Sequence, residues 1–184
     1  MRILIACEFS GTVRDEFLKR GHDAWSCDII DCDKGPARHI KDDVRNVLKD
    51  KWDIIIAHPP CTNLCVSGAR WWKDKGEECL VDAIGLVMSI WNSDCEKVVI
   101  ENPVGRLSSL WMKPSQIIHP WQHGHGETKK TCLWIRGLPL LVPRNIVSGR
   151  DSRIHHMPPG VDRWKSRSKT YIGIARSMAM QWGN

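Results

Sequence analysis

Short apolar segments that alternate with helical patterns constrain the fold of this chain more than any other feature. Buried strands are predicted over residues 2–9, 23–29, 52–57 and 97–100. Apolar residues at helical spacing predict helices between them, over residues 12–20, 44–48 and 77–91. Strands that alternate with helices are typical of an α/β fold with a mainly parallel sheet and helices on both faces.

Three polar segments each come at the carboxyl end of one of these strands. They are the acidic stretch at 28–31, the His-Pro-Pro-Cys sequence at 58–61 and the Glu-Asn-Pro sequence at 101–103. In parallel α/β sheets, ligands bind outside the carboxyl ends of the strands. We therefore expect the three segments to converge on one rim of the sheet.

The sequence changes character after about residue 105, where Pro, Gly, His and Trp become frequent. A strand is predicted here over residues 131–135 and a last helix over residues 171–182. The 184 residues are enough for one domain, so we expect a single catalytic domain spanning 1–184. Within it, residues 135–169 are predicted to be a loop-rich insertion, referred to below as the basic insertion.

The charge balance favours an anionic partner. The chain has 27 Lys and Arg against 21 Asp and Glu, a formal net charge of +6. Nucleic acid is the first candidate, because cations on loops bind phosphate and release counterions. Runs of charge can also simply be solvated surface. The residues predicted to contact DNA are Lys129, Lys130, Arg150, Arg153, Arg163, Lys165 and Arg167.

Eight cysteines are spread over strand-like and helix-like contexts, and no secretory signal precedes them. Reduced thiols and a cytoplasmic location are therefore expected. The apolar runs are far shorter than the roughly 20 residues that span a bilayer, so no membrane partner is expected.

Cys61 and Glu101 form the pair of residues with the clearest chemistry. Two prolines make the turn before Cys61 rigid, and Glu101 reaches the same rim from another strand. A thiolate can attack an electron-poor ring carbon while a carboxylic acid protonates a ring nitrogen. The alternative is a buried cysteine in a tight turn and a glutamate in a surface ion pair.

These motifs, in this order along nearly the whole chain, resemble the cytosine carbon-5 DNA methyltransferases, in particular the short forms of phages and prophages. Residues 58–61 resemble the Pro-Pro-Cys nucleophile loop, and residues 101–103 resemble the Glu-Asn-Val loop. Residues 128–131 look like the basic segment that grips the target nucleotide. Residues 170–175 resemble the motif that closes over the methyl donor.

The resemblance implies a Rossmann-like class I methyltransferase fold with S-adenosylmethionine as cofactor. Asp28 would hold the ribose of the donor, while Asp43 and Val44 would read its adenine. The other residues implied in donor binding are Phe9, Ser10, Gly11 and Pro59. Read without the resemblance, residues 10–12 predict only a turn with a helix-capping side chain.

The resemblance also implies a mechanism on a cytosine flipped out of DNA. Cys61 would attack ring carbon 6, and Glu101 would donate a proton to ring nitrogen 3. Asn102 would orient the loop through backbone hydrogen bonds. Lys130 would hold the cytosine carbonyl or a flanking phosphate; Lys129 and Lys130 could equally be a solvated pair.

The sequence departs from the family pattern at several places. Val13 stands where a second glycine is usual, Thr62 where glutamine is usual, and Pro103 where valine is usual. The target-recognition region, normally a separate domain, is reduced here to the basic insertion. Short or loose sequence specificity is expected as a result.

Other interpretations remain open at this point. The chain could be a non-catalytic nucleic-acid-binding module of the same fold, or it could methylate cytosine in RNA. A monomer is possible. No metal is expected, since three histidines near Cys132 (His119, His123 and His125), and the pair Cys61 and Cys65, match no compact zinc pattern. Residues 70–72 (Arg-Trp-Trp) could fill the space left by a flipped base or pack in the core.

Overall fold

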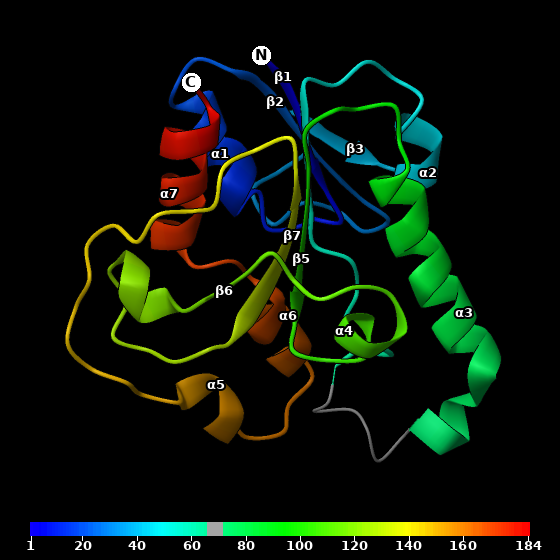
Figure 1. Ribbon diagram of the computed structural model, residues 1–184, viewed down its shortest axis with the longest axis vertical. Helices are drawn as coiled ribbons and strands as arrows, with labels where there is room; N and C mark the ends of the chain where they lie inside the picture. The colour runs from blue at the N-terminus through cyan, green and yellow to red at the C-terminus, as the bar shows by residue number, and fades with distance from the viewer. Residues whose placement is uncertain (66–71) are drawn as a thin grey trace.

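The computed structural model describes residues 1–65 and 72–184 of the chain. Its centre is a seven-stranded sheet in the order β3-β2-β1-β4-β5-β7-β6 (Figure 1). The strands are β1 (Arg2–Ala6), β2 (Asp23–Asp28), β3 (His39–Lys41), β4 (Ile54–Ala57), β5 (Val98–Pro103), β6 (Gln116–Ile118) and β7 (Thr131–Arg136). The helices are α1 (Thr12–Leu18), α2 (Val44–Val47), α3 (Trp72–Trp91), α4 (Leu107–Leu110), the 3-10 helix η2 (Pro120–His123), α5 (Arg153–His156), α6 (Arg163–Ser168) and α7 (Ile172–Trp182).

The direction of the strands identifies the fold class. The five neighbouring strands β3, β2, β1, β4 and β5 all pair in parallel. Strand β7 runs antiparallel to both of its neighbours, β5 and β6. A parallel sheet in this order, with β7 reversed beside β5, is the Rossmann-like arrangement of class I methyltransferases. The predicted α/β fold class is confirmed.

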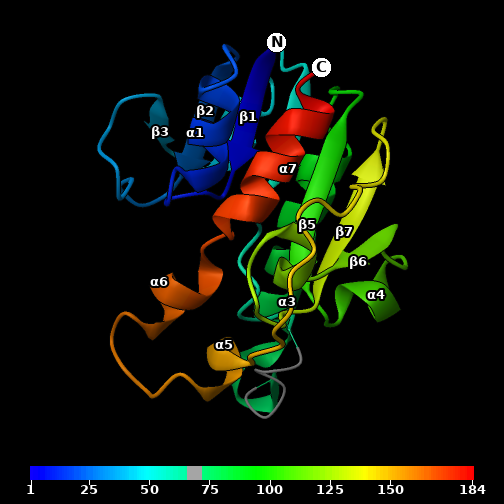
Figure 2. The same cartoon turned by 90° about the vertical axis from the view of Figure 1, so that its left-hand side faces the viewer.

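Alternating side chains of the strands build a core on each face of the sheet. Ile3 and Ile5 of β1 pack with the buried residues of α1 and α7. Leu4 and Ala6 point the other way and pack with α2 and α3. Figure 2 shows α7 and α3 on opposite sides of the strands. Both faces are therefore covered, and continuous apolar runs such as Ile54–Ala57 are buried throughout.

The first turn of α1 is capped from outside the helix. Gly11, in the left-handed region with φ 63°, is the N-cap residue and provides no capping side chain. Glu8, only 4% exposed, instead accepts hydrogen bonds from the amides of Val13 at 2.7 Å and Arg14 at 3.3 Å. Within residues 10–12, Ser10 Oγ accepts from the Thr12 amide at 3.2 Å, so the predicted capping side chain is present, and Glu8 satisfies the next two amides.

Several short elements carry no sequence pattern long enough to be predicted. β3, α4 and β6 were missed, and α3 begins at Trp72 rather than at residue 77, since residues 73–76 are polar or glycine. The basic insertion begins inside β7 and contains α5 and α6, so it is less irregular than predicted. Arg70 and Trp71, the possible base-replacing residues, lie outside the described residues.

No helix in the described ranges, 1–65 and 72–184, is long and apolar enough to cross a membrane.

Replacing Glu8 tests the external cap. Glu8→Ala leaves the α1 amides without an acceptor and should lower the free energy of unfolding by about 1–3 kcal/mol. Glu8→Gln keeps one carbonyl oxygen and should lose less. Urea denaturation of both variants and the wild type measures the difference; equal stability of all three contradicts the capping role.

Candidate active site

The loops after β1 and β4 meet the end of β5 at the carboxyl edge of the sheet. Of the three segments expected at this rim, residues 58–61 follow β4 and residues 101–103 form the end of β5. The amide of His58 donates to the carbonyl of Ala6 at 2.9 Å. Asn102, 1% exposed, donates through Nδ2 to the carbonyl of Pro59 at 2.8 Å. Side chains that are far apart in the sequence are thereby fixed around one rim.

Cys61 sits in a tight turn that the segment after β5 supports. The carbonyl of Cys61 accepts from the amides of Leu64 and Cys65, both at 2.9 Å. The amide of Arg106 donates to the carbonyl of Leu64 at 2.7 Å. A Cβ atom on Gly105 would lie 1.9 Å from that carbonyl oxygen, so only glycine lets the two backbones approach this closely.

The surroundings of Cys61 keep its thiol protonated. A hydrogen bond with Cys65, burial and the negative charge of Glu101 raise the pKa of the Cys61 thiol well above its ordinary value; the charge of Lys129 opposes them. The thiol therefore lies within the electrostatic influence of both the carboxyl group and the ammonium group.

Glu101 is ionised in the same site. Burial alone would raise the pKa of Glu101, but the hydrogen bond from His58 and the charge of Lys129 outweigh burial and hold it below its ordinary value. His58 Nδ1 lies 3.4 Å from Glu101 Oε2, and the two side chains are 8% and 14% exposed. A thiol beside a carboxylate is the reverse of the thiolate and carboxylic acid that the sequence suggested.

Lys129, rather than Lys130, acts on this pair. The Lys129 ammonium shifts the pKa of both Cys61 and Glu101. Lys130 is exposed, and its charge is felt instead by His119, whose pKa is lowered by burial and then by Lys130. The placement of Lys130 at the cytosine carbonyl or a flanking phosphate stays a prediction. The two side chains differ because adjacent residues in an extended segment point to opposite sides.

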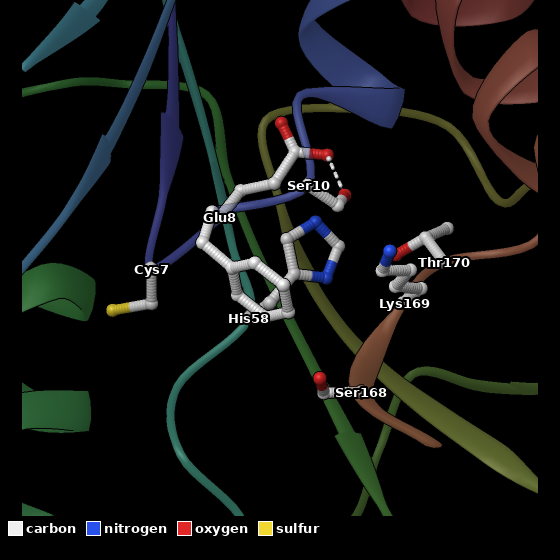
Figure 3. A pocket seen from close by; sticks show the side chains of 8 residues that line it. Cys7, Glu8, Ser10, His58, Ser168, Lys169 and Thr170 are labelled. Atoms are coloured by element: carbon white, nitrogen blue, oxygen red, sulfur yellow. Dashed lines mark hydrogen bonds between the residues drawn. The ribbon is translucent and has the colours of Figure 1, made fainter. Parts of the chain in front are cut away.

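A small pocket lies beside His58. Figure 3 shows the imidazole ring among Glu8, Ser10, Lys169 and Thr170. The lining residues are Cys7, Glu8, Phe9, Ser10, His58, Ser168, Lys169 and Thr170. The pocket joins the loop after β1, which holds the predicted donor residues Phe9, Ser10 and Gly11, to the end of β4 and the segment before α7.

Helix α6 and the segment before α7 contact the loops after β1 and β2. Trp164 of α6 packs on the ring of Phe9 at 5.6 Å between centroids. Lys169 Nζ makes an ion pair with Asp33 at 2.6 Å. Part of the basic insertion is therefore attached to the predicted donor loop, in agreement with the position of α6 below the strands in Figure 2.

The predicted acidic donor residues lie along this rim. Asp28 is the last residue of β2. Burial raises the pKa of its carboxyl group, and hydrogen bonds from the amides of Ile30 and Ile29 partly offset this increase. Asp43 caps α2 by accepting from the Arg45 amide at 2.9 Å and also pairs with the Arg45 guanidinium. The Asp43 carboxylate is thus already engaged, and Val44 beside it is buried.

The predicted DNA-binding side chains make several contacts within the protein. Arg153 pairs with Glu127 at 3.0 Å, and the Arg150 guanidinium lies 3.9 Å above the Trp121 ring. Lys165 Nζ lies 5.7 Å from the centre of the Trp164 ring. Arg163 and Arg167 are half-buried on α6, where the Arg167 carbonyl accepts from Lys129 Nζ at 3.1 Å. Arg153 therefore helps to order the insertion.

Two of the three histidines considered for a metal site, His123 and His125, bind the last helix, and His119 stacks on Trp121. His123 Nδ1 lies 2.8 Å from Ser177 Oγ, and burial lowers the pKa of His123 to about 4. His125 Nε2 accepts from the amide of Gly173 at 3.0 Å. Across residues 1–65 and 72–184, no three His, Cys, Asp or Glu side chains are grouped as metal ligands.

Two residues of the site, Glu8 and His58, were given no role by sequence reasoning. His58 gave a direct signal, since it immediately precedes the two prolines before Cys61. Glu8 becomes recognisable only through its contacts with the first turn of α1. Trp164 and Lys169 belong to the basic stretch that the sequence predicts to contact DNA, and their contacts with Phe9 and Asp33 come from the tertiary structure.

Comparison with known proteins gives little further information. No protein-family model matches the sequence, and no curated protein matches it. One matching solved structure, from E. coli, is described as a candidate DNA modification methyltransferase encoded within a prophage. It has 12% sequence identity and a TM-score of 0.49, with 86% of this chain and 55% of that chain covered. The chain thus spans about half the length of that structure.

Substitution at Gly105 tests the support of the Cys61 turn. In Gly105→Ala the added Cβ collides with the Leu64 carbonyl, and overpacking of this kind costs about 1–3 kcal/mol. Hydrogen exchange at the Leu64 and Cys65 amides should accelerate about tenfold or more. Gly85→Ala on α3, where a Cβ meets nothing within 4 Å, is the matched control. Unchanged exchange in Gly105→Ala refutes this role.

Proposed function

We propose that the protein is a DNA methyltransferase that transfers a methyl group from S-adenosylmethionine to carbon 5 of cytosine in DNA through a covalent Cys61 adduct. The observation that carries the proposal is that the Asn102–Pro59 hydrogen bond and the pairing of β4 with β5 bring the Cys61 loop and Glu101 to one edge of the sheet, where the charge of Lys129 acts on both. The motif resemblance and the fold class support the same reaction.

Each step of the proposed reaction has a residue with the required chemistry. Cys61 attacks carbon 6, which moves electron density onto ring nitrogen 3, where Glu101 delivers a proton. Carbon 5 thereby becomes nucleophilic and would form a bond to the methyl group that S-adenosylmethionine supplies. The carbon 5 proton would then pass to water, the Cys61 sulfur would leave as a thiolate and the proton on ring nitrogen 3 would return to Glu101, which restores the aromatic ring. Asn102 holds the Cys61 loop in place through Pro59.

The ionisation of the free protein defines what cytosine binding must change. Cys61 must lose its proton and Glu101 must gain one before attack. The Cys61–Cys65 hydrogen bond must also be given up. Lys129 stabilises negative charge on either group, so it fits both the resting carboxylate and the attacking thiolate.

The residues at the rim fit the methyl donor. Asp28 is a partly buried carboxylate with a raised pKa, and two hydroxyl donors of a ribose would stabilise its charged form. Phe9, Ser10 and Gly11 would surround the remainder, and Pro59 would border it. Asp43 would contribute only where its bonds to Arg45 leave an oxygen free. S-adenosylmethionine, when bound, supplies an electrophilic methyl group.

The basic insertion is proposed to contact DNA as a reduced target-recognition region. It lies at the same end of the molecule as the strand ends, where α5 and α6 stand below the sheet (Figure 1). Lys165 and Arg167 are proposed to bind phosphates, together with Arg150 and Arg163. Assays on matched DNA and RNA oligonucleotides separate this proposal from RNA methylation.

A trapping experiment tests the covalent step. With donor and DNA that contains 5-fluorocytosine, the wild type should form an adduct that survives denaturation, because fluorine cannot leave as a proton does. Cys61→Ser should form none. Cys79→Ser, which removes an exposed thiol on α3, should behave as wild type. Glu101→Gln should slow adduct formation by about 10²- to 10⁴-fold.

The wild type is tested on DNA that carries 5-fluorocytosine in many sequence contexts. If it forms no adduct while it still binds the donor, this mechanism is contradicted. DNA binding without methyl transfer then points to a non-catalytic module.

Donor binding can be tested separately by calorimetry. Asp28→Asn removes the charged acceptor, and hydrogen bonds to charged groups contribute about 1.5–3 kcal/mol, so donor affinity should fall about 10- to 100-fold. Asp31→Asn is the matched control, because the Asp31 side chain is 84% exposed and pairs with Lys41 on the surface. Equal affinities for Asp28→Asn and wild type remove Asp28 from the donor site.

A further inference from the structure

His58 connects Glu101 with the pocket beside it. Its Nδ1 atom lies 3.4 Å from Glu101 Oε2, and its side chain is 8% exposed. Its other nitrogen, Nε2, is buried and has no hydrogen-bond partner among residues 1–65 and 72–184. His58 lines the pocket formed with Ser10, Lys169 and Thr170 (Figure 3).

The chemistry of the two nitrogens follows from this geometry. An ionised carboxylate can only accept hydrogen bonds, so the hydrogen of the His58–Glu101 contact is on Nδ1. In the neutral ring, Nε2 then carries a lone pair. A buried nitrogen lone pair without a donor is costly, unless a molecule in the pocket uses it.

We propose that His58 relays a proton from the pocket to Glu101. This inference rests on the proposed function, because it supplies the proton that Glu101 must gain before it can donate to the cytosine ring. Since His58 acts on the substrate through Glu101, it is a positioning and relay residue.

The proton balance of the relay is simple. A hydronium ion that reaches the pocket from solvent transfers a proton to Nε2, so that a new Nε2–H bond forms and a neutral water molecule remains. The Nδ1–H bond breaks and its proton forms the O–H bond of Glu101. The ring remains neutral before and after the step, with its hydrogen moved from Nδ1 to Nε2. Rotation or exchange in the pocket then restores the starting tautomer.

The charged groups around the ring suit such a relay. Glu101 of β5 faces Nδ1, and Lys129 before β7 acts on that carboxylate. Glu8 and Cys7 from the loop after β1 and Lys169 from the segment before α7 line the pocket. Because charges of both signs border the pocket, water there has donors and acceptors to order it.

Substitution of His58 separates the relay from simple support. His58→Asn keeps an amide donor near the Nδ1 position but cannot pass a proton. The single-turnover rate of adduct formation should fall about 10- to 100-fold, with a larger loss around pH 8.5 than around pH 6.5, where protons are more available. The KM for DNA should stay within about threefold, because substrate contacts are retained.

The matched control is His22→Asn. His22 also has a buried unpartnered Nε2 within the described residues, but it packs on Phe17 of α1, away from the rim. Its pH profile should be that of the wild type. A His58→Asn profile that matches the wild type overturns the relay, as does a uniform loss at every pH.

Chemical rescue covers the case in which His58→Asn folds poorly. His58→Gly opens space at the pocket. Added imidazole should raise the rate of adduct formation by this variant about tenfold. Imidazole should restore nothing in Cys61→Ser. Failure of imidazole to act on a folded His58→Gly protein contradicts the relay.

A measurement that needs no catalysis distinguishes the relay from the proposed function. Nitrogen-15 NMR of His58 should show the Nδ1–H tautomer in the wild type and a changed tautomer balance in Glu101→Gln. If the wild type forms no 5-fluorocytosine adduct, the proposed reaction fails whatever the NMR result. If the adduct forms but the tautomer does not respond to Glu101→Gln, only the relay fails.

Discussion

The hydrogen bond from Asn102 to the carbonyl of Pro59 is the contact on which the site depends most. It joins the end of β5 to the loop after β4, with both groups inside the protein. A buried carbonyl left unpaired would cost stability, so this bond keeps the two loops in register. The close approach of Gly105 to Leu64 fixes the same loop from its other side. Cys61 and Glu101 are held together as a consequence.

Electrostatics then decide the resting state of the site. The hydrogen bond with Cys65, burial and the carboxylate of Glu101 raise the pKa of Cys61, while His58 and Lys129 keep Glu101 ionised. The free protein therefore holds a weakly nucleophilic thiol, and activation has to accompany substrate binding. An unreactive resting thiol also avoids side reactions of a thiolate. The proposed relay through His58 gives Glu101 a route to its proton within the fold.

Much of the fold could be predicted, because long apolar runs and helical spacing are local patterns. The strand Ile54–Ala57 and the helix that ends at Trp91 follow from the residues themselves. β3 and β6 could not be predicted, since strands of three residues form only where a neighbouring strand offers hydrogen bonds. α6 is polar and short, and its place depends on contacts such as that of Trp164 with Phe9.

The sequence by itself determined that Cys61 and Glu101 end neighbouring buried strands and so reach one rim, because parallel strands share a direction. Only the tertiary structure decided that the charge of Lys129 acts on them, that Glu8 caps α1 and that Arg153 pairs with Glu127. It also decided the ionisation of the thiol and the carboxyl group. These features depend on charges and hydrogen bonds between distant segments, and burial sets their strength.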